Sequence, residues 1–171
     1  MSLSVELPLD PSAASAARSV HSPAALRRVA REFTRDPDLV SSLPVSAAER
    51  TWVRLTTPGD LAAWVIRWPA GTSTGWHDHI GEDGEGVHGT FVVVQGLLLE
   101  SSWSGRAVVR RRLGSGGTRS FGPSYVHDVA SIGDEPAVSV HVYSPQLAAM
   151  RTYSVDSGEL ALTGIGPLDE W

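Results

Sequence analysis

Short β-rich runs separated by turn signals constrain this chain more than any other feature. From Arg50 onward, stretches rich in Val, Thr and aromatic residues alternate with dipeptides typical of turns, such as Gln95-Gly96 and Ser104-Gly105. Strands this close in sequence cannot be joined by parallel crossovers, so the sheet is expected to be largely antiparallel. Many such strands in one chain favour a sandwich or barrel, with the jelly roll as a natural closure. The expected strands are residues 51–56, 61–68, 90–95, 97–103, 106–113, 126–131, 137–143 and 150–156.

The segment before Arg50 predicts a helical section that packs on this β region. Ser22-Pro23 is a helix start signal, because a capping hydroxyl precedes a proline at the first helical position. An apolar stripe at helical spacing follows, and Asp36-Pro37 is expected to end the helix. A second short helical turn is predicted from Pro37 to about Ser42. The stripe consists of Leu26, Val29, Ala30 and Phe33.

The length of 171 residues fits one domain and is too short for two comfortable ones. We therefore expect a single domain over residues 21–171, with helices at about 21–49 and a β-barrel at about 50–171. Residues 1–20 are rich in Ser, Ala and Pro without clear periodicity, a composition compatible with partial disorder. They lack the apolar run of a signal peptide, and no stretch approaches membrane-spanning length, so a cytoplasmic protein is expected.

Charge and cysteine content exclude several classes of function. The net charge is −5, so no overall positive field favours nucleic acid or a membrane surface. The chain has no cysteine, which excludes disulfides, thiolate zinc sites and a cysteine nucleophile. Any metal site must therefore use histidine, carboxylate or backbone oxygen ligands. No sequence feature indicates an obligate protein partner.

A histidine pair is the strongest chemical signal in the chain. His77 and His79 form an H-x-H pair, and on a strand this spacing places both imidazoles on the same face. A third ligand must come from another strand, and His127 follows a turn that leads into one. An H-x-H pair can also arise by chance on an exposed strand. Together with the later histidine, the pattern predicts a three-histidine metal site.

Three motifs carry a resemblance to a known family. The run GTSTGWHDH from Gly71 to His79 resembles the first cupin motif, and GPSYVH from Gly122 to His127 resembles the second. The stretch EPAVSVHVYSP from Glu135 to Pro145, together with Trp68, resembles the thiol dioxygenases of the cysteine dioxygenase family. The similarity covers roughly Arg50 to Tyr153. It implies a mostly β, cupin-type antiparallel jelly-roll barrel with a short N-terminal helical section.

The resemblance also implies roles for individual residues. His77, His79 and His127 match the ligands of an Fe(II) ion, and Arg54 matches the arginine that binds the substrate carboxylate. A second group of residues matches a hydrogen-bonded series beside the iron. Its members alternate along one strand, so their side chains face the same side. The implied reaction adds dioxygen to a small thiol and forms a sulfinic acid. The hydrogen-bonded series consists of Ser139, His141 and Tyr143.

The chain departs from the family pattern near Gly89. Many cupins have a glutamate ligand at this position, and mammalian members of the family have a cysteine cross-linked to the tyrosine matched by Tyr143. The loop 80–88 is longer than in the mammalian pattern and contains Glu82 and Glu85. Either glutamate could supply a fourth ligand, as in manganese or nickel cupins, although the acidic, Gly-rich run is typical of an exposed loop. His88 could line the pocket or face solvent.

The substrate is left open by the sequence alone. L-Cysteine is favoured over 3-mercaptopropionate, because family members with an arginine at the position of Arg54 tend to be cysteine enzymes. A non-catalytic metal-binding cupin is the alternative of another class, since a fold does not determine a function.

Overall fold

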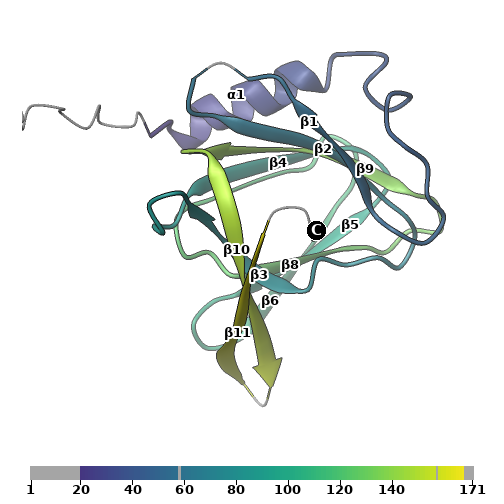
Figure 1. The fold of residues 1–171 in the computed structure, drawn as a ribbon. Helices are drawn as coiled ribbons and strands as arrows, with labels where there is room; N and C mark the ends of the chain where they lie inside the picture. Colours follow the sequence, from purple (N-terminus) through teal and green to yellow (C-terminus); the bar gives the residue numbers. More distant parts are fainter. Residues whose placement is uncertain (1–19, 58, 157, 168–171) are drawn as a thin grey trace, which may run out of the picture.

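The computed structural model describes residues 20–57, 59–156 and 158–167, so the N-terminal segment predicted to be partly disordered lies almost entirely outside the described residues (Figure 1). The elements in this part of the chain are α1 (Pro23–Phe33), β1 (Thr51–Leu55), β2 (Ala62–Trp68), β3 (Trp76–Gly81), β4 (His88–Gln95), β5 (Leu98–Trp103), β6 (Val108–Leu113), β7 (Thr118–Phe121), β8 (His127–Ser131), β9 (Ala137–Ser144), β10 (Leu147–Asp156) and β11 (Glu159–Pro167).

The strands form two antiparallel sheets that face each other, as the sequence predicts. One sheet has the order β1-β2-β9-β4-β7 and the other the order β11-β10-β3-β8-β5-β6. One core cluster joins them, with Trp64 and Phe91 from the first sheet and Leu98 and Val129 from the second. Helix α1 covers the outer face of the first sheet, and the β10–β11 hairpin projects away from the barrel (Figure 1). The mostly β, antiparallel fold is thereby confirmed.

Strand β9 is buried on both faces, and this decides which side chains reach the interior. Val138, Val140 and Val142 pack in a cluster with Leu26 and Ala30 of the helix. Because successive strand residues point to opposite faces, the alternate side chains of β9 must point between the sheets. A strand that is apolar toward the helix therefore directs its polar residues into the barrel.

Helix α1 begins as its sequence predicts and ends at Phe33, three residues before Asp36. The Ser22 hydroxyl accepts a hydrogen bond from the Ala25 backbone N–H at 3.3 Å, and Pro23 occupies the first turn. The second predicted helical turn, from Pro37 to about Ser42, is present as hydrogen-bonded turns, in which the Ser42 N–H donates to the Asp38 carbonyl oxygen, and it does not extend into a helix. One α-helix is thus present in the described residues of the 21–49 section. It is too short to cross a membrane.

Three strands lie outside the eight runs expected from the sequence. Strand β3 contains the H-x-H pair and has few β-branched residues, so its strand structure comes from pairing with β10 and β8. Strand β7 has only four residues. Strand β11 forms a hairpin with β10, and several of its side chains are exposed. In each case tertiary pairing outweighs a weak local signal.

Candidate metal centre

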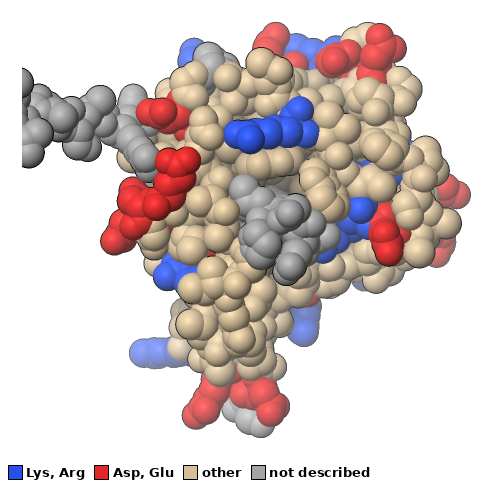
Figure 2. All heavy atoms as spheres, viewed as in Figure 1, with Lys and Arg blue, Asp and Glu red and all other residues tan. Residues whose placement is uncertain are grey.

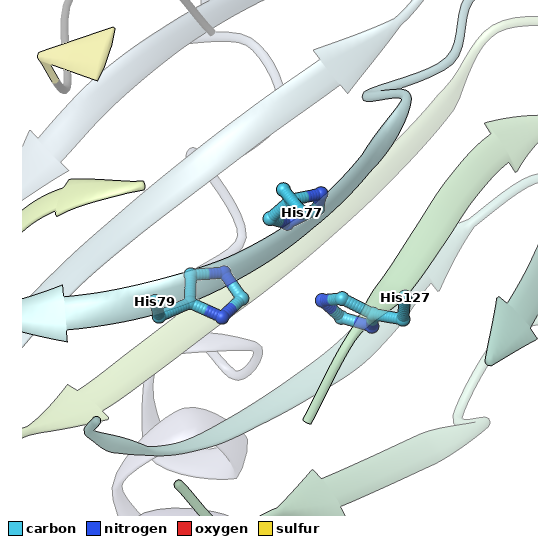
Figure 3. A group of neighbouring side chains, drawn as sticks. All are labelled: His77, His79 and His127. Atoms are coloured by element: carbon cyan, nitrogen blue, oxygen red, sulfur yellow. The ribbon is translucent and has the colours of Figure 1, made fainter. Parts of the chain in front are cut away.

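The three predicted ligands meet between the two sheets. His77 and His79 project from the inner face of β3, and His127 begins β8 directly opposite His77 in the antiparallel ladder. Their possible ligand atoms all lie within 4.8 Å of one another, and each side chain is buried. Figure 3 shows the three imidazoles turned toward a common space. Among the described residues, this is the one group of His, Asp and Glu side chains that meets these distances.

The residue between the two β3 ligands holds the strand in place from its other face. Asp78 is almost fully buried and accepts two hydrogen bonds from the Arg151 guanidinium, each of 2.8 Å. The Tyr153 hydroxyl donates a third hydrogen bond to the same carboxylate at 3.0 Å. These bonds join β3 to β10 on the outer face. The histidines on either side of Asp78 consequently point inward.

The hydrogen bonds of the ring nitrogens suit a bound metal ion. His77 Nδ1 lies 2.9 Å from the Gly75 carbonyl oxygen, and His127 Nδ1 lies 3.2 Å from a Glu100 carboxylate oxygen. Both partners only accept, so each Nδ1 carries the proton and each Nε2 carries a lone pair. The Nε2 atoms of His79 and His127 are buried without a hydrogen-bond partner. A metal ion would satisfy these atoms, so the donor set fits one.

The electrostatics of the site favour neutral ligands. Burial lowers the pKa of His77 and of His79 well below the ordinary value, and the nearby histidines lower it further. Neutral imidazole is the form that binds a metal ion, whereas imidazolium cannot. Both rings are therefore ready to act as ligands at neutral pH.

In the described part of the chain, no carboxylate belongs to the group of candidate ligands. Glu82 and Glu85 are exposed in the turn after β3, outside the group of candidate ligands. Gly89 is buried and pairs with both Tyr143 and Phe121 in the first sheet. A Cβ atom at Gly89 would overlap the Phe121 ring, which stacks on His79 at 5.3 Å between centroids. An aromatic ring thus fills the space that a ligand at position 89 would need.

A polar series on β9 lies beside the histidines. The Trp68 indole N–H donates to Ser139 Oγ at 2.8 Å, and Ser139 Oγ lies 2.8 Å from His141 Nε2. His141 Nδ1 lies 3.3 Å from the Tyr143 hydroxyl, and the Tyr143 ring lies 4.7 Å from the His79 ring. The predicted series is present as a continuous set of contacts that ends next to a ligand.

Burial determines the protonation of this series. It lowers the pKa of His141 to about 3, with a smaller contribution from the charge of Arg50. Burial also raises the pKa of Tyr143. His141 is therefore neutral and Tyr143 a protonated phenol. If Ser139 donates to Nε2, then His141 Nδ1–H donates to the tyrosine oxygen, and Tyr143 is a hydrogen-bond donor at the end of the series.

Arg54 is an exposed residue of β1. It pairs with Trp64 across β1 and β2, and its guanidinium carbon lies 5.7 Å from the centre of the Trp64 ring. Its Nη2 donates to the Gln146 side-chain oxygen at 3.2 Å. Trp64 in turn contacts Tyr143 edge to face at 5.8 Å. Arg54 is thus linked to the polar series through one aromatic ring.

Two charged residues of the site were missed by sequence reasoning. Arg50 lies over Trp68, and its charge contributes to the lowered pKa of His77 and of His141. Glu100 is fully buried and contacts His127. Glu100 stands in the apolar strand sequence LLLESSW, where a single charge among strand residues is unusual. That signal could have drawn attention to it.

Charged side chains of both signs lie on the face drawn in Figure 2. There, arginine and acidic side chains form small separate groups among uncharged residues. This mixed distribution agrees with the net charge of −5.

Comparison with known families identifies the family to which the chain is related. The family model described as cysteine dioxygenase type I matches residues 10–156. This chain belongs to that family. The cysteine dioxygenase family implies a dioxygenase that acts on thiols and uses a metal, and the three histidines are compatible with that requirement. No curated protein matches the chain.

Solved structures support the cupin fold of this family member. A conserved Klebsiella pneumoniae protein with a double-stranded β-helix domain is 19% identical with a TM-score of 0.52, covering 73% of this chain and 93% of its own. TT1209 from Thermus thermophilus is 15% identical with a TM-score of 0.53, covering 63% and 94%. Oxalate oxidase with glycolate is 17% identical with a TM-score of 0.52, covering 82% and 74%. At these identities the likeness concerns the fold alone.

Proposed function

We propose that this chain is a non-haem iron dioxygenase that converts L-cysteine to its sulfinic acid. The observation that carries the proposal is the group of three buried histidines beside the Ser139, His141 and Tyr143 series, in a chain that belongs to the cysteine dioxygenase family. The reaction is RSH + O2 → RSO2H. Both oxygen atoms are added to sulfur, which is oxidised by four electrons, and dioxygen accepts those four electrons.

Iron(II) is the proposed metal. Three neutral imidazoles leave the ion with its full positive charge, and imidazole is a ligand that suits iron. When bound, iron would supply the positions at which a thiolate and dioxygen meet, and the redox chemistry that activates dioxygen. The residues of this chain that would hold it are His77, His79 and His127, each through Nε2 in the arrangement described above.

The polar series would orient the bound substrate and donate a hydrogen bond to it. Tyr143 keeps its proton because burial raises its pKa, so its hydroxyl can donate to a polar group of the thiol acid. His141 is hydrogen-bonded to the tyrosine oxygen, and Ser139 is hydrogen-bonded to His141. Because Trp68 also donates to Ser139, the order of donors along the series is favoured in one direction.

Arg54 is the proposed anchor for the substrate carboxylate. Its guanidinium is exposed and is bonded to a neutral amide, Gln146, which a carboxylate could replace. A guanidinium binds a carboxylate through two parallel, charge-assisted hydrogen bonds. The proposed substrates are therefore thiol carboxylates, with L-cysteine ahead of 3-mercaptopropionate. Cysteamine, which has no carboxylate, should be a poor substrate.

Oxygen uptake with a panel of thiols tests the proposal. The protein is loaded with Fe(II) without oxygen and then mixed with L-cysteine, 3-mercaptopropionate or cysteamine, and the sulfinic product is measured by mass spectrometry. Uptake with formation of cysteine sulfinic acid is expected, with lower efficiency for the other two thiols. Preference for 3-mercaptopropionate would replace the substrate assignment but keep the reaction. An iron-loaded protein that consumes no oxygen with any of these thiols would contradict the proposed function.

A further inference from the structure

Glu100 on β5 is a buried carboxylate in direct contact with one of the three histidines. Its side chain is fully buried, and its Oε1 lies 3.2 Å from His127 Nδ1. Its Oε2 lies 2.6 Å from Arg119 Nε. Both carboxylate oxygens are thus used, one toward the metal centre and one toward a counter-ion. Glu100 lies outside the group of candidate ligands, so its contribution to the site must pass through His127.

Arg119 is the counter-ion of Glu100. Its guanidinium is always charged and donates from Nε to Glu100 Oε2, so this contact favours the ionised carboxylate. Arg119 belongs to β7 in the opposite sheet, and its Nη2 also donates to the Tyr125 hydroxyl at 3.0 Å. An ionised carboxylate can only accept hydrogen bonds. Its His127 partner must therefore carry the proton on Nδ1.

The Nδ1 atoms of His77 and His127 have different hydrogen-bond partners. His77 donates from Nδ1 to a neutral carbonyl oxygen, that of Gly75, whereas His127 donates to a full negative charge. A carboxylate behind a histidine fixes the tautomer and ring orientation and makes the other nitrogen a stronger electron donor. Of these two ligands, His127 should accordingly be the stronger electron donor to the metal.

We propose that Glu100 is a positioning residue, which holds His127 Nε2 toward the metal and places a negative charge behind one ligand, while Arg119 moderates that charge. The inference rests on the three-histidine metal centre of the proposed function, and it does not depend on the substrate. A purely structural ion pair between the sheets would make a different prediction. Removal of either partner would then loosen the same contact and affect the metal in the same direction.

Two substitutions separate these possibilities by the sign of their effects. Glu100→Gln keeps the size and an oxygen acceptor but removes the negative charge next to His127. Arg119→Gln keeps the glutamate and removes its counter-ion. Since negative charge near a metal stabilises its oxidised form, the Fe(III)/Fe(II) potential should rise in Glu100→Gln and fall in Arg119→Gln. Glu100→Ala removes the positioning contact altogether, and its Fe(II) affinity should drop about 10- to 100-fold.

The measurements are Fe(II) and Zn(II) affinities by competition with a chelator, and the iron potential by spectroscopic titration, on the full chain. Circular dichroism checks that each variant is folded, and Glu100→Gln keeps the test valid if Glu100→Ala does not fold. Potentials that move in the same direction in the two Gln variants, or a folded Glu100→Ala that binds Fe(II) as tightly as the parent, would overturn the proposal. A parent protein that binds neither metal would overturn it too. Normal metal binding without thiol turnover would contradict only the proposed function.

Discussion

Substitution of Gly89 by alanine tests whether the Phe121 ring fills the space in which other cupins have a fourth ligand. The Cβ atom would overlap the Phe121 ring, which is buried and stacks on His79 and Tyr125. Forcing extra volume into a packed core typically costs about 1–3 kcal/mol. For a chain of this size each kcal/mol lowers the melting temperature by roughly 2–4 °C, so we expect a fall of about 2–12 °C. Because the displaced ring would press on a ligand, Fe(II) affinity should also fall.

Thermal and urea unfolding of the metal-free protein measure this effect, with two controls. Gly114→Ala is the matched control, because a Cβ atom there meets no atom within 4 Å and the change should cost less than about 0.5 kcal/mol. Phe121→Leu should partly relieve the overlap, so the double variant should be more stable than the sum of the single effects predicts, by about 0.5 kcal/mol or more. A Gly89→Ala protein with the stability of the parent, or strict additivity in the double variant, would refute the packing argument.

Four further outcomes are expected. His127→Ala should lose bound iron, measured by metal analysis, and all thiol-dependent oxygen uptake; full activity would remove the metal assignment. Tyr143→Phe should keep iron but slow kcat by about tenfold or more, and the intact mass of the parent should match an uncross-linked chain, which contains no cysteine. Arg54→Ala should raise KM for cysteine about tenfold or more, whereas Arg110→Ala on exposed β6 should not; equal KM values would disprove the anchor. The pKa of His141 is about 3 in the folded protein and about 6.5 in the unfolded chain, so the unfolded chain binds the proton first as pH falls. The free energy of unfolding of the metal-free protein should therefore decrease from pH 6.5 toward pH 3, by up to about 1.4 kcal/mol per pH unit from this group. Urea unfolding at several pH values should show a smaller dependence of stability on pH in His141→Gln.

Much of the architecture follows from local sequence patterns. The capping serine, the proline and the apolar stripe of residues 23–33 specify helix α1, because these interactions lie within one or two turns. The eight β-rich runs and their turns indicated an antiparallel barrel for the same reason. The alternation of side chains along a strand likewise placed His77 with His79 on one face, and Ser139, His141 and Tyr143 on another.

Other features depended on contacts between segments far apart in the sequence. The register that puts His127 opposite His77 joins residues in different strands, and no local pattern specifies it. Strands β7 and β11, and the bounds of β3, were not among the expected runs because their structure comes from pairing with neighbouring strands rather than from their own residues.

The charges and packing of the metal centre belong to the same category. Glu100 and Arg119 come from opposite sheets, so only the assembled barrel brings a carboxylate to His127 and a counter-ion to that carboxylate. Gly89 appeared in the sequence as a missing ligand, and the tertiary structure gives its physical reason in the Phe121 ring that fills the space. The sequence by itself determined which residue types could bind a metal ion, since that depends on their chemistry. Their protonation, partners and available space were decided by burial, which exists only once the two sheets have closed.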